Sequence, residues 1–207
     1  MKKLLSSIEK LKKGKIRKLV DKRIKEFKNL GKKSSSELFK ELCFCILTAN
    51  STAEQCIKVH CRVGDDFLTL NQSSLQKKLK SLGCRFHTKR AAYISESNQY
   101  KKSLKNIIQK LEKNEKRDWL VKNIKGLGYK EASHFLRNIG CDDYAIIDFH
   151  IADILVKNKL IKRPKTLNKN HYIEIEKKIR EISKKLKITL AELDLYLWYL
   201  ETGKILK

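Results

Sequence analysis

The chain has 207 residues, enough to bury a core as one domain or two small lobes, and with one proline and eight glycines it is short of turn-forming residues. Lysine and arginine outnumber aspartate and glutamate by 48 to 23, and the net charge of +25 favours nucleic acid as the partner, although an acidic membrane surface would also suit it. No apolar stretch reaches the ~18 residues of a membrane helix and no signal-peptide core occurs, so we expect a soluble intracellular protein of the cytoplasm or nucleoid.

Long stretches rich in Leu, Ile, Lys and Glu predict an all-α protein. The first thirty residues predict one or two basic amphipathic helices. Their apolar positions at core spacing are Leu4, Leu5, Ile8, Leu11, Ile16, Leu19, Val20, Ile24 and Phe27.

The most hydrophobic helix of the chain is expected to follow Ser34, because Ser34-Ser35-Ser36-Glu37 has the spacing of a capping box. Its sequence, LFKELCFCILTA, should be central to the core. The helix is expected to end in a polar segment around Asn50. This asparagine either has a functional role or caps the helix that begins near Thr52.

A loop from Gly83 to Ala91 contains Phe86 among four basic residues, which are Arg85, His87, Lys89 and Arg90. The basic neighbours favour a loop that faces solvent and phosphate, whereas burial in the core is the commoner fate of phenylalanine. Helical regions are then expected from about Lys89 to Leu111 and from Glu115 to Ile124.

The stretch from Asn123 to His150 organises the chain. A helix ends at Lys125, Gly126-Leu127-Gly128 makes a tight turn, and helical periodicity runs from Lys130 to Asn138, which predicts a helix-hairpin-helix. The glycines Gly126 and Gly128 bring the amides at the start of the second helix close to a ligand, and a phosphate oxygen is the natural one.

Asp148 opens another apolar helix, Phe149 to Val156, unless Ala145-Ile146-Ile147 forms a short buried strand. A loop around Pro164 follows, then a basic helix from about Tyr172 to Leu186. The last helix begins after Thr189, which Glu192 follows at capping-box spacing.

Gly126, Gly128, Lys130 and Asp148 together resemble the helix-hairpin-helix DNA glycosylases of the endonuclease III superfamily. In these enzymes a lysine after the hairpin and an aspartate eighteen or nineteen residues later form the catalytic pair, and here Asp148 follows Lys130 by eighteen. One departure is Lys125, where family members often carry proline.

The resemblance implies two helical lobes flanking a cleft, one of residues 36–138 with the hairpin and the other of residues 1–35 plus 139–207. The six cysteines, which contain no C-x-x-C pair, are expected to be buried thiols. The superfamily members with a C-terminal iron-sulfur cluster are excluded because no cysteine follows Cys141. We expect no cofactor.

The resemblance also assigns the chemistry. The positive end of a helix dipole disfavours an ammonium at Lys130 and frees the amine to attack carbon, although bound DNA phosphates act in the opposite direction. Asp148 would accept the proton and stabilise positive charge on the deoxyribose as the base leaves. The lysine would then remain on the sugar as an imine and promote strand cleavage. A metal site at Asp148, His150 and Asp153 is disfavoured, because one helix turn without a distant ligand makes a poor site.

In the superfamily, a residue at the position of Asn50 enters the space left by the extruded base, and an aromatic residue at the position of Phe86 is a wedge in the base stack. The C-terminal stretch from Asp194 to Lys207 resembles the type 2 8-oxoguanine DNA glycosylases, small archaeal and bacterial enzymes that also end in lysine. Trp198 would stack on the flipped base. The terminal carboxylate of Lys207, or a backbone carbonyl nearby, would accept the N7 hydrogen that distinguishes 8-oxoguanine from guanine. Alternatively, Trp198 anchors the last helix in the core and Lys207 frays into solvent.

These features predict a monomeric base-excision repair enzyme, a bifunctional DNA glycosylase and AP lyase that acts on double-stranded DNA containing 8-oxoguanine. One alternative is a glycosylase for another oxidised base on the same scaffold. The other is a non-catalytic helix-hairpin-helix DNA-binding protein, which would need neither Lys130 nor Asp148.

Overall fold

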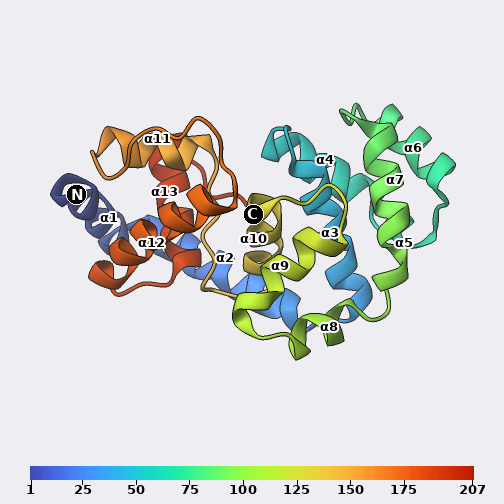
Figure 1. Ribbon diagram of the computed structural model, residues 1–207, viewed down its shortest axis with the longest axis horizontal. Coiled ribbons are helices and arrows are strands. Elements are labelled where there is room, and N and C mark those ends of the chain that lie inside the picture. The colour runs from blue at the N-terminus through green and yellow to red at the C-terminus, as the bar shows by residue number, and fades with distance from the viewer. The chain divides into compact units, whose positions relative to one another are not determined.

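The protein is all-α, as predicted. The computed structural model describes residues 1–207, which form thirteen α-helices and one short 3-10 helix and contain no strand (Figure 1). None of these helices combines the length and the apolar character needed to cross a bilayer. The alternative of a buried strand at Ala145-Ile146-Ile147 is wrong, because these residues are buried but form no strand.

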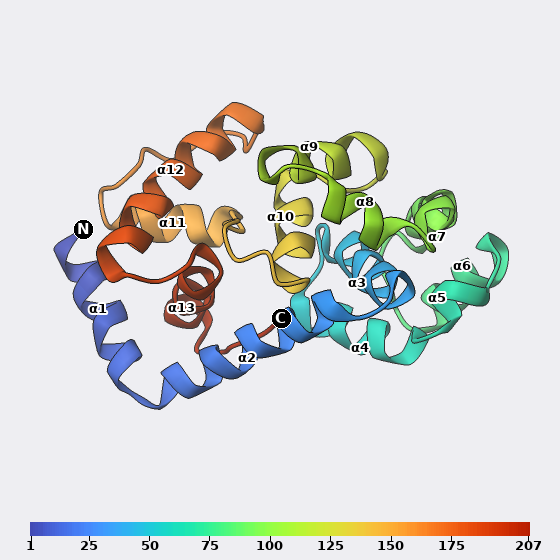
Figure 2. The same ribbon diagram turned by 90° about the horizontal axis from the view of Figure 1, so that it is seen from below.

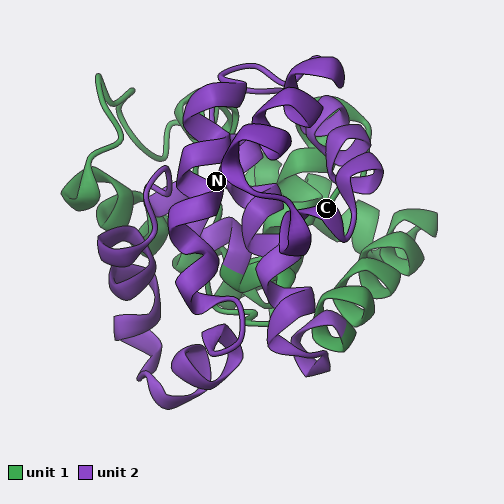
Figure 3. Ribbon diagram, turned by 90° about the vertical axis from the view of Figure 1, so that its right-hand side faces the viewer, with its two compact units in different colours: residues 1–29, 136–207 green, residues 30–135 purple.

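The chain divides into two compact units (Figure 3). The terminal unit contains residues 1–29 and 136–207, and the central unit contains residues 30–135. The chain leaves and re-enters the terminal unit inside two helices, α2 (Lys15–Lys32) and α10 (Tyr129–Asn138). The resemblance placed the boundaries after residues 35 and 138, a few residues later than the observed ones after residues 29 and 135. Neither observed boundary lies in a loop.

Four helices besides α2 build the terminal unit, which are α1 (Lys2–Lys13), α11 (Phe149–Lys157), α12 (Lys169–Leu186) and α13 (Leu190–Thr202). Helix α13 packs against α11 and α12, and α1 packs against α12 and α13, as both views show (Figure 1, Figure 2). The predicted capping box at Thr189 and Glu192 is confirmed. On α2, Val20 and Phe27 are buried, but the core position expected for Leu19 is wrong. Leu19 is 50% exposed because it points about a quarter-turn away from Val20 around the helix.

The central unit is built around α3 (Ser35–Thr48), in which every residue from Glu41 to Thr48 is buried. The side chain of Ser34 accepts a hydrogen bond from the backbone N–H of Glu37, so the predicted cap is present. The Glu37 carboxylate pairs with Lys40. Helix α3 contacts α4, α5, α7 and α8, which confirms the central position expected for it.

The central unit contains six further helices besides α3. They are α4 (Ala53–Val63), α5 (Asp66–Thr69), α6 (Gln72–Ser81), α7 (His87–Ser97), α8 (Leu104–Lys110) and α9 (Lys113–Asn123). The helical region expected from about Lys89 to Leu111 is interrupted, because α7 ends at Ser97 and a 3-10 turn precedes α8. The sequence patterns did not predict α5 and α6.

The cysteines are all free thiols, and the expectation of burial holds for Cys43, Cys45, Cys56 and Cys84. It is wrong for Cys61, which is exposed, and Cys141 is only half-buried. Burial raises the pKa of the Cys56 thiol to about 11.

Gly140 offers a test of packing in the terminal unit. Its φ is +88°, and a Cβ placed there would lie 3.0 Å from the Cα of Lys28 on α2. Gly203 has a similar φ of +70°, but a Cβ there would meet nothing within 4 Å. Replacing Gly203 by alanine should therefore reduce the free energy of unfolding by only the backbone term, ~1 kcal/mol. Replacing Gly140 by alanine should reduce it by about 3 kcal/mol, because overpacking adds to the backbone term. Urea denaturation of both variants measures the difference, and equal losses would contradict the close approach of α2.

Candidate functional site

The hairpin between α9 and α10 requires glycine at Gly126. Gly126 has a φ of +85°, and a Cβ there would lie 2.5 Å from the ring of Tyr93, so a larger residue does not fit. The backbone N–H of Gly128 donates to Oε2 of Glu131 at 3.1 Å. The start of α10 therefore already attracts a carboxylate, which is the property expected of an anion-binding helix N-terminus.

Lys130 is the second residue of α10, so its predicted place in the first turn is confirmed. Its Nζ lies 3.6 Å from Oε1 of Glu131, and its side chain is 28% exposed. Glu131 thus contacts the hairpin amide through one carboxylate oxygen and the Lys130 ammonium through the other. The sequence patterns missed Glu131. Its position three residues after Gly128, where helix-capping carboxylates occur, was the available signal.

Asp148 is the N-cap of α11, which confirms the capping role expected for it. Its Oδ1 accepts a hydrogen bond from the backbone N–H of Ile151 at 3.0 Å. The carboxylate is only half-buried, whereas the four residues before it, Tyr144 to Ile147, are buried. Asp148 therefore stands at the point where a buried segment without regular secondary structure meets a helix.

The residues Ala145, Ile146 and Ile147, which we call the anchored segment, lie outside helix and strand, and two of their backbone N–H groups donate to buried side chains. Ala145 donates to Oε1 of Glu176 at 3.2 Å, and Ile147 donates to the hydroxyl of Tyr172 at 3.0 Å. The same hydroxyl donates to the carbonyl of Ala145 at 2.7 Å. Side chains from α12 therefore replace the strand partner that the segment lacks.

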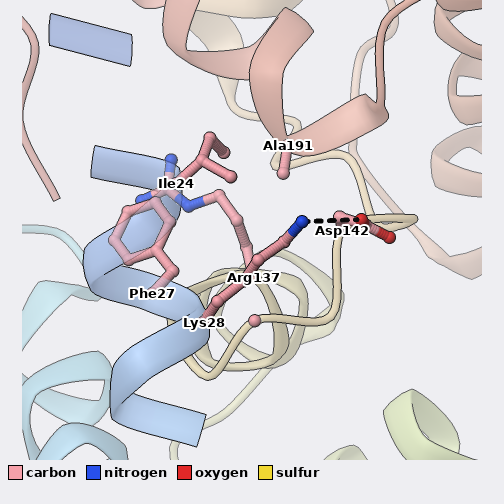
Figure 4. A pocket seen from close by; sticks show the side chains of 7 residues that line it. Ile24, Phe27, Lys28, Arg137, Asp142 and Ala191 are labelled. Atoms are coloured by element: carbon pink, nitrogen blue, oxygen red, sulfur yellow. Dashed lines mark ion pairs between the residues drawn. The ribbon is translucent and has the colours of Figure 1, made fainter. Parts of the chain in front are cut away.

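Asp194 forms a buried ion pair with Arg137, and the two side chains are 8% and 4% exposed. The Arg137 guanidinium also lies 4.7 Å from the centre of the Phe27 ring and donates to the side-chain oxygen of Asn138 at 2.9 and 3.1 Å. Figure 4 shows Arg137 beside Phe27, in a small depression that Gly140, Asp142 and Ala191 also line. Three contacts therefore hold the guanidinium in one place.

Burial raises the pKa of Asp194 to about 6, Arg137 opposes this rise, and the nearby charge of Asp148 adds to it. Near neutral pH the carboxylate is thus ionised and paired. The sequence patterns did not single out Asp194 or Arg137. The signal for Asp194 was an acidic residue inside the apolar run LDLYLWYL, since a charge in such a run is buried only when it is paired.

In the central unit, the loops of Asn50 and Phe86 are held together by two arginines. Arg90 donates to the carbonyl of Ala49 and to the hydroxyl of Ser51, and Arg85 donates to the carbonyl of Asn50 at 3.3 Å. Both guanidinium groups also lie over the Phe86 ring, 5.2 and 5.7 Å from its centre. The expectation that Arg90 faces solvent and phosphate is wrong, because its side chain is 4% exposed and links the two loops.

Asn50 and Phe86 share an uncommon backbone conformation, with φ of 55° and 54°. Left-handed backbone in residues other than glycine is frequently found at functional sites. The alternative that Asn50 caps the next helix is wrong, because Thr52 does so by accepting from the N–H of Gln55. Asn50 is exposed, and Phe86 is 51% exposed rather than part of the core.

At the C-terminal end, the Trp198 ring packs edge to face against His150 with 5.8 Å between centres. Its Nε1 is buried and has no hydrogen-bond partner. Trp198 is half-buried, as are Ile205, Leu206 and Lys207.

The three residues of the disfavoured metal site have other contacts. Asp148 caps α11, His150 packs against Trp198, and Asp153 pairs with Arg163 at 3.1 Å. No group of three or more histidine, cysteine, aspartate or glutamate side chains has an arrangement that would hold a metal ion.

The sequence matches a family model described as 8-oxoguanine DNA glycosylase over residues 20–188. A curated 8-oxoguanine DNA glycosylase/AP lyase from Methanocaldococcus jannaschii is 54% identical, with 99% of each chain covered. A protein of the same name from Korarchaeum cryptofilum is 46% identical, with 99% of this chain and 98% of the relative covered.

Solved structures show the same similarity. The M. jannaschii 8-oxoguanine glycosylase/lyase in complex with a 15mer DNA containing 8-oxoguanine matches with a TM-score of 0.95 and 52% identity, covering 99% of each chain. The 8-oxoguanine DNA glycosylase of Thermotoga maritima matches with a TM-score of 0.93 and 38% identity, covering 100% of this chain and 99% of that one.

The raised pKa of Asp194 predicts a pH-dependent stability. Between the ordinary value of 3.8 and about 6, the folded protein holds a proton at Asp194 that the unfolded chain has lost. The free energy of unfolding of the wild type should therefore fall, relative to that of Asp194→Asn, as pH rises through this window. Urea denaturation at a series of pH values measures the two curves. Curves that stay parallel from pH 4 to 7 would contradict the burial of an ionisable Asp194.

Proposed function

The chain belongs to the 8-oxoguanine DNA glycosylase family, and from that membership we propose that Lys130 and Asp148 carry out the chemistry of a bifunctional DNA glycosylase and AP lyase. The substrate is double-stranded DNA containing 8-oxoguanine, and the process is base-excision repair. Genomic DNA inside the cell is the place where such an enzyme works.

The observation that carries the proposal is the position of the two residues at helix N-termini. Lys130 directly follows the hairpin turn in α10, and Asp148 caps α11 with one carboxylate oxygen. The other oxygen of Asp148 is the one proposed to act on the substrate. Among the many lysines of the chain, Lys130 combines the first turn after the hairpin with partial burial.

The reaction begins when the damaged nucleotide leaves the base stack, at a cost of a few kcal/mol, because its glycosidic carbon is enclosed in the duplex. The Lys130 amine, released from Glu131 and deprotonated, then bonds to C1′ of the deoxyribose as the bond from C1′ to the base breaks. Asp148 takes the amine proton and stabilises the positive charge that develops on the sugar.

The same bond between Lys130 and C1′ provides the lyase step. Opening of the sugar ring converts the adduct into an imine, whose positive nitrogen acidifies the hydrogen on C2′. Loss of that proton breaks the C3′–O bond and cleaves the strand 3′ to the abasic site. Water then releases Lys130, so one amine serves both activities.

Asn50 and Phe86 are proposed to hold the duplex open, while the hairpin at Gly126 and Gly128 binds a phosphate. Two observations support this role for the loops. Both side chains are exposed on strained backbone, and Arg85 and Arg90 fix the loops relative to each other. An exposed aromatic ring on a rigid loop is suited to enter a base stack.

Trp198 and Lys207 are proposed to form the base pocket. The indole Nε1 of Trp198 lacks a protein acceptor, and a buried donor without a partner is rare unless a ligand supplies one. A main-chain oxygen at Lys207 would accept the N7 hydrogen of 8-oxoguanine. Guanine has an acceptor at N7, so the same oxygen would repel it.

Replacing Lys130 by glutamine should abolish both base release and the adduct that borohydride traps, because the amide cannot attack C1′. Binding to lesion DNA should change little, since the hairpin amides remain. Lys178→Gln is a matched control, because Lys178 is an exposed α12 lysine whose pairing with Glu181 is remote in sequence from the hairpin. Gel assays of strand cleavage and of the borohydride-trapped adduct measure both losses. A trapped adduct with the Lys130 variant would show that another lysine is the nucleophile.

Deleting Lys207 should reduce excision of 8-oxoguanine roughly ten- to a hundredfold, because a lost hydrogen bond to a buried donor is worth ~1–3 kcal/mol. Cleavage at a preformed abasic site should be nearly unchanged, because that substrate has no base to recognise. Single-turnover rates on the two substrates measure the contrast. Equal losses on both would mean that the tail supports folding instead of base recognition.

A further inference from the structure

One arginine of the central unit is buried without a counter-ion. Arg90 is the fourth residue of α7 and is 4% exposed. Its guanidinium contacts a carbonyl, a hydroxyl, a thiol and an aromatic ring, but no carboxylate. Burying a charge without a partner of opposite charge is costly, even where hydrogen bonds replace part of its hydration. Stability alone is therefore a poor reason for an arginine at this position.

We infer that Arg90 is a positioning residue, which locks the loops of Asn50 and Phe86 together so that the two side chains enter the duplex as one rigid unit. The inference rests on the proposed role of these two loops. It adds that opening of the duplex depends on a buried cation, which itself does not touch DNA.

Arg90 holds the Asn50 loop on both sides of Asn50. One guanidinium nitrogen, Nη2, donates to the carbonyl of Ala49 and to the hydroxyl of Ser51, the latter at 3.0 Å. Between these two residues Asn50 has a φ of 55°, a conformation that is unfavourable for residues other than glycine. The strained residue is thus fixed by its neighbours, and its side chain is left exposed.

The other guanidinium nitrogen holds the Phe86 loop. Nη1 donates to the sulfur of Cys84 at 3.3 Å, and the guanidinium carbon lies 5.7 Å from the centre of the Phe86 ring. The backbone N–H of Arg90 also donates to the carbonyl of Phe86 at 3.0 Å. A planar group with donors in several directions can bind two loops at once, whereas the ammonium of a lysine is a single point charge.

Arg85 also contacts both loops, but it is not equivalent to Arg90. It is exposed, it makes one hydrogen bond to the Asn50 loop, at 3.3 Å, and it belongs to the Phe86 loop itself. An exposed arginine keeps many side-chain conformations available. Arg90 instead extends from α7, a helix that contacts α3 and α6. The rigid part of the unit therefore acts on the loops through Arg90.

The test compares Arg90→Lys with the wild type on 8-oxoguanine in duplex and in single-stranded DNA. Single-turnover release from the duplex should slow roughly ten- to a hundredfold, since a misplacement of about 1 Å can have an effect of this size. Release from the single strand should change little, because an unpaired base needs no residue to hold a duplex open. The fluorescence of a 2-aminopurine beside the lesion, which rises when the base stack opens, should rise correspondingly more slowly.

A second comparison shows whether Arg90 acts through the two loops. The combined variant Asn50→Ala and Phe86→Ala lacks both side chains that Arg90 is inferred to position. In that background Arg90→Lys should slow release from the duplex no further. Losses that multiply would mean that Arg90 acts on overall stability and not through Asn50 and Phe86.

Two further variants separate positioning from folding. Arg62→Lys makes the same chemical change at an exposed arginine in the last turn of α4 and should keep the wild-type rates. Ser51→Ala removes one acceptor of Arg90 at a half-buried position, so it should fold even if Arg90→Lys does not. It should slow release from the duplex several-fold and leave release from the single strand unchanged.

The inference would be overturned by wild-type release from the duplex in folded Arg90→Lys, by equal losses on duplex and single strand, or by multiplied losses in the combined background. If Arg90→Lys does not fold, wild-type release in Ser51→Ala has the same meaning. Wild-type release from the duplex in the combined Asn50→Ala and Phe86→Ala variant would instead contradict the proposed role of the loops, so the two failures are distinguishable within one set of proteins.

Discussion

The main constraint on the terminal unit is that its chain passes through the core without helix or sheet between Asp142 and Asp148. Each buried backbone N–H there needs an acceptor, and an unmade hydrogen bond would cost about 1–3 kcal/mol. The acceptors with hydrogen bonds to this stretch are buried polar side chains on α12, and Ala191 at the start of α13 donates to the carbonyl of Asp142 at 3.0 Å. Buried polar side chains of this unit thus bind the backbone of one segment, and Asp148 follows that segment directly.

The central unit also has irregular segments that other side chains must hold in place, and these lie at its surface. The loops of Asn50 and Phe86 both contain left-handed residues, and such backbone persists only where neighbouring contacts hold it. Arg90 supplies these contacts from a buried position, and Arg85 supplies them from an exposed one. In both units a buried charged side chain holds a short irregular segment, and a residue at the surface end of that segment, half-buried Asp148 or exposed Asn50 and Phe86, is the one proposed to act on DNA.

Helix content, the hairpin and the caps at Ser34, Asp148 and Thr189 could be predicted from the sequence, because they depend on residues close together in the chain. The contacts of Arg90, Arg137 and Asp194 could not, since their partners lie 57 residues away for Arg137 and about 40 for Arg90. Basic residues near Phe86 suggested phosphate contacts, but burial reversed that expectation for Arg90. The predicted burial of Leu19 was wrong for a related reason, because the spacing of apolar residues does not tell how wide the buried face of a helix is.

The central claim is that the amine of Lys130 forms the covalent bond to the sugar. The most direct measurement is to reduce the complex of wild-type protein and 8-oxoguanine DNA with borohydride, digest both components and locate the modified peptide by mass spectrometry. The sugar remnant should lie on Lys130, in the peptide that contains the start of α10. A remnant on any other lysine, or on the N-terminal amine, would contradict the assignment.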